Sequence, residues 1–131
     1  MIVIPTKPTV FCDIDDTIAL WSPTQEQLDE YGVEITCPGS SIEIDGQITS
    51  ITSWTEKLVP HRKHIEQLKK HKMRGHIVVL WSAGGADWCA AVAKAFNLEN
   101  IVDLCISKPN WAYDDLQPNE FIPKPIWLKD E

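Results

Sequence analysis

The stretch HIVVLWSAGGADWCAAVAKAFNL, residues 76–98, contains the pattern that decides the fold. Residues 76–81 form a nearly continuous apolar run, which is typical of a strand buried on both faces. A serine and two glycines end the run, and an alanine-rich segment then places Trp88, Val92 and Ala95 at helical spacing. The stretch therefore predicts a buried strand, a glycine-containing loop and a helix.

The flanking sequence repeats this alternation of strands and helices. Apolar runs at 9–13 and 101–106, and a short one at 111–113, predict three further strands. A helix is predicted from Pro60, which suits a first helical turn, to Gly75, which favours a helix end. This order is typical of an α/β domain with a mainly parallel sheet, and right-handed connections would place helices on both of its faces.

Residues 22–59 depart from this alternation. A short helix is predicted there with Ser22 as its cap and Gly32 as its end, and Asp45-Gly46 between alternating residues is a strong hairpin signal. The segment is too short for an independent domain. We therefore interpret the chain as one domain, 1–131, with a β-hairpin flap or small cap-like insertion.

Length and charge limit the class of protein. With 131 residues, 44% of them hydrophobic and 24% charged, the chain is expected to be globular. Its net charge of −7 argues against non-specific binding to nucleic acid, which needs a cationic surface. No apolar stretch approaches the ~18 residues of a membrane-spanning helix, and no signal peptide is recognised. We therefore expect a cytoplasmic protein with no membrane partner, and its four cysteines, which lack a Cys-x-x-Cys pair, are expected to be reduced thiols.

Acidic residues collect where the predicted strands end. Asp13, Asp15 and Asp16 follow the first strand, and Asp114 and Asp115 follow the last. Open parallel sheets bind ligands at the carboxyl ends of their strands. Carboxylates that converge there require a cation, and with no histidine or cysteine among them they favour Mg²⁺. The sequence therefore predicts a magnesium site at this edge of the sheet.

Groups suited to phosphate follow the two strands in between. Ser82 and the backbone N–H groups of Ala83 and Gly84 lie just before a predicted helix, where they can donate to phosphate oxygens. Lys108, after the third apolar run, supplies a positive charge for a carboxylate nucleophile and a transferring phosphoryl group. Together with the acidic residues, these groups predict a phosphoryl-transfer site.

The order of these motifs strongly resembles that of the haloacid dehalogenase-like (HAD) superfamily. Asp13-Ile14-Asp15-Asp16-Thr17 is followed by Ser82, then Lys108, then Asp114-Asp115, over residues 9–115. The resemblance implies a three-layer Rossmann-like fold and a phosphatase that forms an aspartyl-phosphate. It implies that Asp13 is the nucleophile and Asp15 the general acid/base. It also implies that Mg²⁺ is held by Asp13, the main-chain carbonyl of Asp15 and Asp114, with Asp115 as helper or alternative, and it gives Asp16 no catalytic role.

The resemblance implies a Mg²⁺-dependent phosphomonoesterase for a phosphorylated small molecule, such as a nucleotide or sugar phosphate. Two alternatives stay open: an open-site phosphatase for phosphoprotein or nucleic-acid ends, and a non-catalytic HAD-fold binding domain. Trp21, Trp54 and Trp81 are interpreted as packing residues, with stacking on an aromatic substrate as the alternative. Only five residues separate Lys108 from Asp114, too few for a parallel crossover, so the strand order there stays open, as does the oligomeric state.

Overall fold

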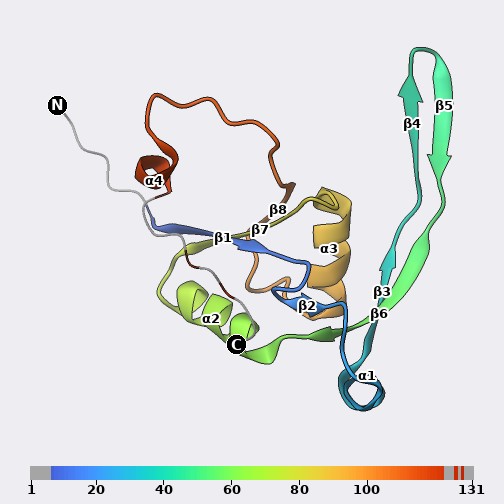
Figure 1. Cartoon of the computed structure of the whole chain (residues 1–131), viewed down its shortest axis with the longest axis horizontal. Helices are drawn as coiled ribbons and strands as arrows, with labels where there is room; N and C mark the ends of the chain where they lie inside the picture. The colour runs from blue at the N-terminus through green and yellow to red at the C-terminus, as the bar shows by residue number, and fades with distance from the viewer. Residues whose placement is uncertain (1–6, 123–125, 127, 129–131) are drawn as a thin grey trace.

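The computed structural model describes residues 7–122, 126 and 128, and shows a mixed α/β fold built on a small parallel sheet (Figure 1). The sheet has three strands in the order β1-β7-β8, with bounds β1 Thr9–Asp13, β7 Ile77–Ser82 and β8 Leu104–Ser107. All three were predicted, although β8 begins three residues later than the apolar run at 101–106. The delay has a local cause, because the N–H groups of Ile101 and Val102 donate to the carbonyl of Leu98 and so belong to a turn.

The strand predicted at 111–113 is wrong. These residues have no regular secondary structure, and the side chains of Trp111 and Tyr113 are 80% and 96% exposed. The short connection after β8 explains the difference, since a parallel neighbour needs a dozen or more connecting residues. The chain instead leaves the sheet after Ser107 and reaches the short helix α4, Pro118–Phe121.

Two helices connect the parallel strands and cover the sheet on one face. Helix α2 spans Arg62–Met73 and α3 spans Ala86–Ala95. With strands in the order β1-β7-β8, right-handed connections place both helices on the same side. On the opposite face, Phe11 and Leu104 remain 47% and 57% exposed. The expectation of helices on both faces is therefore not met by α2 and α3, and the described chain is not a clear three-layer structure.

The start of α2 was predicted two residues too early, at Pro60 instead of Arg62. Pro60 ends strand β6, Trp54–Pro60, and His61 is the N-cap of α2, where its Nδ1 accepts from the N–H of His64 at 3.2 Å. Proline is tolerated at a strand end as well as in a first helical turn, so Pro60 alone did not decide between them.

The insertion contains a helix and a long antiparallel ribbon, which rises away from the sheet in Figure 1. Helix α1, Gln25–Tyr31, is capped by Thr24 rather than Ser22, because Thr24 and Gln27 form a reciprocal capping box. The strands of the ribbon are antiparallel, in the order β2-β6-β3 and β4-β5: β2 Ala19–Leu20, β3 Val33–Cys37, β4 Ser40–Ile44 and β5 Gln47–Ile51. The predicted hairpin turn is confirmed, with positive φ angles of 50° at Asp45 and 77° at Gly46.

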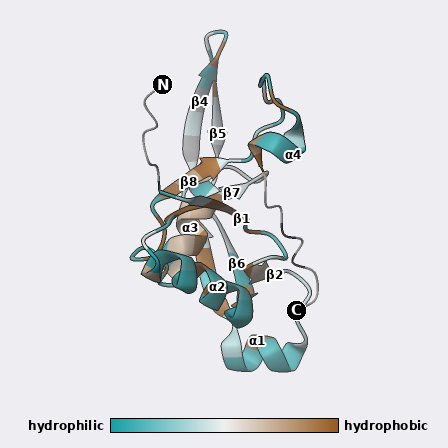
Figure 2. Cartoon of the chain, turned by 90° about the vertical axis from the view of Figure 1, so that its left-hand side faces the viewer, coloured by the Kyte–Doolittle hydropathy of each residue, from teal (hydrophilic) through white to brown (hydrophobic). Residues whose placement is uncertain are grey.

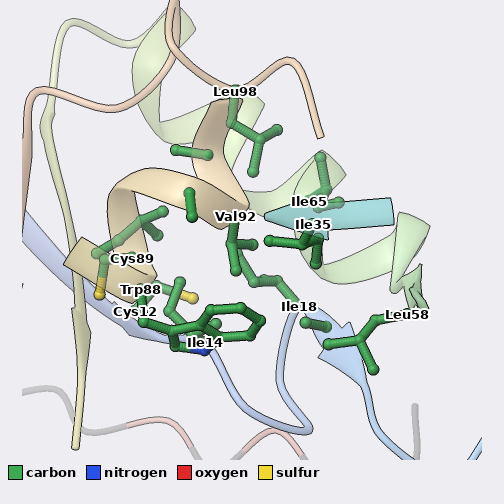
Figure 3. Close-up of a cluster of buried hydrophobic side chains, with 14 of the residues drawn as sticks. Cys12, Ile14, Ile18, Ile35, Leu58, Ile65, Trp88, Cys89, Val92 and Leu98 are labelled. Carbon is green, nitrogen blue, oxygen red and sulfur yellow. The ribbon is translucent and has the colours of Figure 1, made fainter. Parts of the chain in front are cut away.

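The core lies between the helices, the sheet and the base of the ribbon (Figure 3). Ile35 of β3 and Leu58 of β6 belong to the same buried cluster as Val92 of α3 and Ile65 of α2. Figure 2 shows that most of the ribbon of α1 and α2 has the colour of hydrophilic residues. The base of the insertion is thus part of the core, whereas its tip exposes apolar side chains such as Ile48, 73% exposed.

No helix in the described ranges is both long enough and apolar enough to span a membrane.

Candidate functional site

The loop after β1 is held in shape by two buried isoleucines. Ile14 and Ile18 are both fully buried, and the carbonyl of Ile14 accepts from the N–H groups of Thr17, Ile18 and Ala19. Asp16 lies at the turn with a positive φ of 59°, which aspartate tolerates better than most residues. Its side chain caps the loop by accepting from the N–H of Trp21 at 3.0 Å. The carboxylate of Asp16 therefore has a structural contact, and the expectation that it has no catalytic role stays a prediction.

Asp13 points its carboxylate toward a hydroxyl and an ammonium group. Thr17 donates its hydroxyl to Oδ2 at 3.2 Å, and Nζ of Lys108 lies 3.9 Å from Oδ1. The Asp13 side chain is 34% exposed and Lys108 44%, so the pair is open to a ligand from solvent. The structure thus brings together the predicted nucleophile and the predicted cation, although they are 95 positions apart in the numbering.

Asp15 is held by three hydrogen-bond donors. The indole N–H groups of Trp21 and Trp88 donate to Oδ1 at 2.8 and 2.9 Å, and the hydroxyl of Ser82 donates to Oδ2 at 2.9 Å. Each carboxylate oxygen has two lone pairs, so Oδ1 is fully used whereas Oδ2 keeps one. Oδ2 therefore has a free lone pair with which it can exchange a proton with a ligand.

Ser82 connects three parts of the site. Its side chain is fully buried, and its oxygen accepts from the N–H of Gly84 at 2.9 Å while donating to Asp15. Its carbonyl accepts from the N–H of Lys108 at 2.8 Å, which fixes the chain just after β8. Of the predicted phosphate donors, Ser82 and the Gly84 N–H therefore already have protein partners, and Ala83 lies exposed beside them. Their binding of phosphate stays a prediction.

The two glycines that follow Ala83 suit this close packing. A Cβ at Gly84 would lie 3.2 Å from both the hydroxyl of Ser82 and the indole of Trp88. Gly85 has a φ of 103°, a conformation that residues with a Cβ rarely adopt. The sequence WSAGG thus allows Trp88 to approach the carboxylate of Asp15 closely.

His64 contacts the loop that follows β1, and this role was not predicted from the sequence. It is 3% exposed, and its Nδ1 lies 2.5 Å from the carbonyl of Thr17, the residue that donates to Asp13. Its ring stacks on His61 with centroids 3.5 Å apart, and the N–H of His61 donates to the carbonyl of Ile18. The start of α2 therefore holds the loop in place. The sequence signal that could have identified it is its spacing of four residues from Leu68, which places the two side chains on one face of α2.

Asp114 and Asp115 are not brought into a shared metal site with the other carboxylates. Both are exposed, and Oδ1 of Asp114 accepts from the N–H of Leu116 at 2.8 Å. Across residues 7–122, 126 and 128, no group of three or more His, Cys, Asp or Glu side chains could hold a metal ion. The Mg²⁺ site implied by the resemblance uses the carboxylates of Asp13 and Asp114 and the main-chain carbonyl of Asp15, and it stays a prediction.

Two buried thiols lie beneath the site. Burial, and secondly the charge of Asp13, raise the pKa of Cys12 to about 12. Burial raises the pKa of Cys89 to about 12, with smaller contributions from Cys105, Asp15 and Asp13. A thiol attacks as its thiolate, so neither group is a nucleophile near neutral pH. Asp13 is the better-placed nucleophile.

Comparisons with protein-family models, with curated proteins and with solved structures each found no match to this chain.

Proposed function

We propose that the chain is a phosphomonoesterase of the HAD type. The observation that carries the proposal is the convergence of Asp13, Asp15 and Lys108 around the carboxyl ends of three parallel strands. Open parallel sheets bind ligands at this edge. A carboxylate nucleophile, a second carboxyl group and a cation within one site are the groups that phosphoryl transfer through an aspartyl-phosphate needs.

The chemistry follows from the placement of the two carboxylates. An oxygen of Asp13 attacks phosphorus, and the bond from phosphorus to the ester oxygen breaks. Asp15, protonated at Oδ2, gives its proton to the departing oxygen, so the leaving group departs as a neutral alcohol. Asp15 then accepts a proton from water as that water attacks the aspartyl-phosphate, which releases phosphate and restores both carboxyl groups. Lys108 offsets the negative charge that collects on the phosphoryl oxygens.

The three-layer HAD fold and the Mg²⁺ ion are finer parts of the same proposal. The strand order β1-β7-β8, with Asp13, Ser82 and Lys108 at or just after successive strand ends, supports the fold assignment. Mg²⁺ would neutralise charge at Asp13 if the segment carrying Asp114 approached it, but no step above depends on the ion. A cytoplasmic location is proposed on the ground of the four free cysteines.

Phosphate release from p-nitrophenyl phosphate, with Mg²⁺ and with EDTA, tests this function. Asp13→Asn is expected to abolish release, because an amide is a poor nucleophile. Asp16→Asn is the matched control: asparagine tolerates the positive φ and keeps an oxygen acceptor for the N–H of Trp21. Equal release from wild type and Asp13→Asn would show that the nucleophile is wrongly assigned. Release that persists in EDTA would show that the chain works without a divalent ion.

A non-catalytic binding domain is distinguished by a second measurement. Beryllofluoride mimics a phosphoryl group bound to a carboxylate, and is expected to bind the wild-type chain and not Asp13→Asn. Binding to neither protein, together with no phosphate release from any ester, would exclude the phosphomonoesterase.

A further inference from the structure

Three tryptophans from distant parts of the chain meet beside Asp15. Trp21 follows β2, Trp54 begins β6 and Trp88 lies in the first turn of α3. The rings of Trp54 and Trp88 are stacked, with centroids 4.8 Å apart and planes 20° apart, and the centroid of Trp21 lies 5.9 Å from that of Trp88. These three side chains, Trp21, Trp54 and Trp88, are called the indole cluster below.

In the indole cluster the central ring, Trp88, is buried, and the two outer rings, Trp21 and Trp54, are partly exposed to solvent. Trp88 is 3% exposed and is seen among the core side chains in Figure 3. Trp21 and Trp54 are 38% and 39% exposed. One face of Trp54 is covered by Trp88, so its exposed surface lies on the other face and the edges. Packing alone would favour burying these large apolar rings, and their exposure at the candidate site leaves aromatic surface for a ligand.

The indole cluster lies on the leaving-group side of the site. In the proposed reaction, Asp13 and Lys108 face the phosphoryl group, whereas Asp15 donates its proton to the departing oxygen. The indole N–H groups of Trp21 and Trp88 both bond to Oδ1 of Asp15, so their rings extend outward from the same carboxylate. Whatever is attached to the departing oxygen therefore comes close to the indole cluster, in which Trp21 and Trp54 each contact the ring of Trp88.

We propose that Trp21 and Trp54 bind the leaving group by stacking, and that the substrate is a phosphate monoester with a planar aromatic ring, such as a nucleoside monophosphate. The proposal rests on the phosphomonoesterase proposed above and names its substrate class. A nucleobase presents a π-face that stacks on indole rings, whereas a sugar or alkyl phosphate has none. The net charge of −7 favours a free nucleotide over a long polyanion.

The test compares two esters that differ only in the base: AMP and the corresponding ribose phosphate. In wild type, kcat/KM is expected to be at least about tenfold higher for AMP, which is the usual size of one stacked base. In Trp54→Leu the ratio of kcat/KM for AMP to kcat/KM for the ribose phosphate is expected to fall below about three. In Trp54→Phe, which keeps an aromatic ring, the ratio is expected to stay above about three. Trp21 is not the residue to change, because its N–H also holds Asp15.

Tyr31 provides the matched control. It has the same exposure as Trp54, 39%, but lies on α1, where its ring contacts the guanidinium of Arg62. Tyr31→Leu is expected to leave the AMP to ribose phosphate ratio as in wild type. A wild-type ratio near one, or a ratio that Trp54→Leu does not lower, would overturn the stacking proposal.

Failure of the proposed function is recognised separately by a binding measurement. The indole N–H resonances of Trp21 and Trp54 are followed by NMR during titration with AMP and with the ribose phosphate. AMP is expected to shift the Trp54 resonance saturably and the ribose phosphate to leave it in place, even in Asp13→Asn, which cannot form the aspartyl-phosphate. Such shifts without hydrolysis of any ester would reject the phosphomonoesterase and retain the stacking site, whereas no shift with AMP would reject the stacking site.

Discussion

The hydroxyl of Ser82 donates a hydrogen bond of 2.9 Å to Oδ2 of Asp15, and so joins the end of β7 to the loop that follows β1. Because Ser82 is fully buried, the bond is shielded from water, which strengthens it relative to a surface bond. The same oxygen accepts from the N–H of Gly84. One side chain therefore sets both the position of the proposed acid and the shape of the glycine loop.

Ser82→Ala is expected to lower both stability and activity. The change removes a hydrogen-bond donor from Asp15 and an acceptor from the N–H of Gly84. A hydrogen bond to a charged group contributes about 1.5–3 kcal/mol and a neutral one about 0.5–1.5 kcal/mol. Phosphate release is expected to fall roughly tenfold to a hundredfold, a share of the about 10²–10⁴ that a positioned acid contributes. Urea denaturation and steady-state kinetics measure the two effects. The control is Ser41→Ala, which alters an exposed contact with Ser50 in the hairpin and should change neither. Activity unchanged in Ser82→Ala would contradict the positioning role.

His64→Ala is expected to destabilise the folded chain and to make the loop that follows β1, next to Asp13, more mobile. It leaves the carbonyl of Thr17 without its partner and creates a cavity under the loop, with a cost of about 2 kcal/mol or more. Because Thr17 donates to Asp13, phosphate release should fall as well. The midpoint of urea denaturation checks the first effect.

Lys69→Ala serves as the control on the same helix, since Lys69 forms an exposed pair with Glu66. A change within about 0.5 kcal/mol is expected there. If His64→Ala unfolded at the same urea concentration as Lys69→Ala, the bond from α2 to the loop would contribute nothing to stability.

Alkaline pH is expected to destabilise the fold through its buried thiols. The pKa of Cys12 is raised from 9.0 to about 12, so below about pH 9 the thiol is protonated in both folded and unfolded chains. Between about pH 9 and 12 the unfolded chain loses a proton that the folded chain keeps, and the free energy of unfolding falls as pH rises. At about pH 10 the loss is about 1.4 kcal/mol for this thiol.

Comparison of wild type with Cys12→Ala isolates this effect. The variant is expected to be less stable at every pH because of its cavity, but to lose about 1.4 kcal/mol less than wild type between about pH 8 and 10. Urea denaturation at the two pH values measures the difference. Parallel pH profiles for the two proteins would show that Cys12 ionises equally in both states.

The sequence predicted the parts of the site that follow from local patterns. The apolar runs before Asp13 and Ser82 predicted their strands, and parallel strands bring their carboxyl ends together whatever lies between them. Convergence of Asp13, Ser82 and Lys108 was therefore predictable. The partners of Asp15 were not, because Trp88 is 73 positions away and nothing local indicates that its indole N–H faces a carboxylate.

The insertion and the last acidic pair were predicted less well for physical reasons. Strands β3 and β6 were missed, since residues such as Glu34, Thr55 and Lys57 are polar on the exposed side of the ribbon, and their pairing depends on a distant partner. Asp114 follows no element of regular structure, so the rule that ligands gather at strand ends did not apply to it.

Lys108→Met is expected to separate activity from stability. The ammonium group lies 3.9 Å from Oδ1 of Asp13 and 5.7 Å from the centroid of the Trp81 ring, and both charged side chains are more than a third exposed. Such a pair adds little to folding, so the free energy of unfolding should change by less than about 1 kcal/mol. Phosphate release should nevertheless fall by about a hundredfold or more, because the transferring group loses the cation that offsets its charge. The control is Lys72→Met, which breaks the exposed pair of Lys72 with Asp103 and leaves Asp13 untouched. If both lysine variants lost activity equally, the effect would come from the net charge of the protein rather than from the position of Lys108.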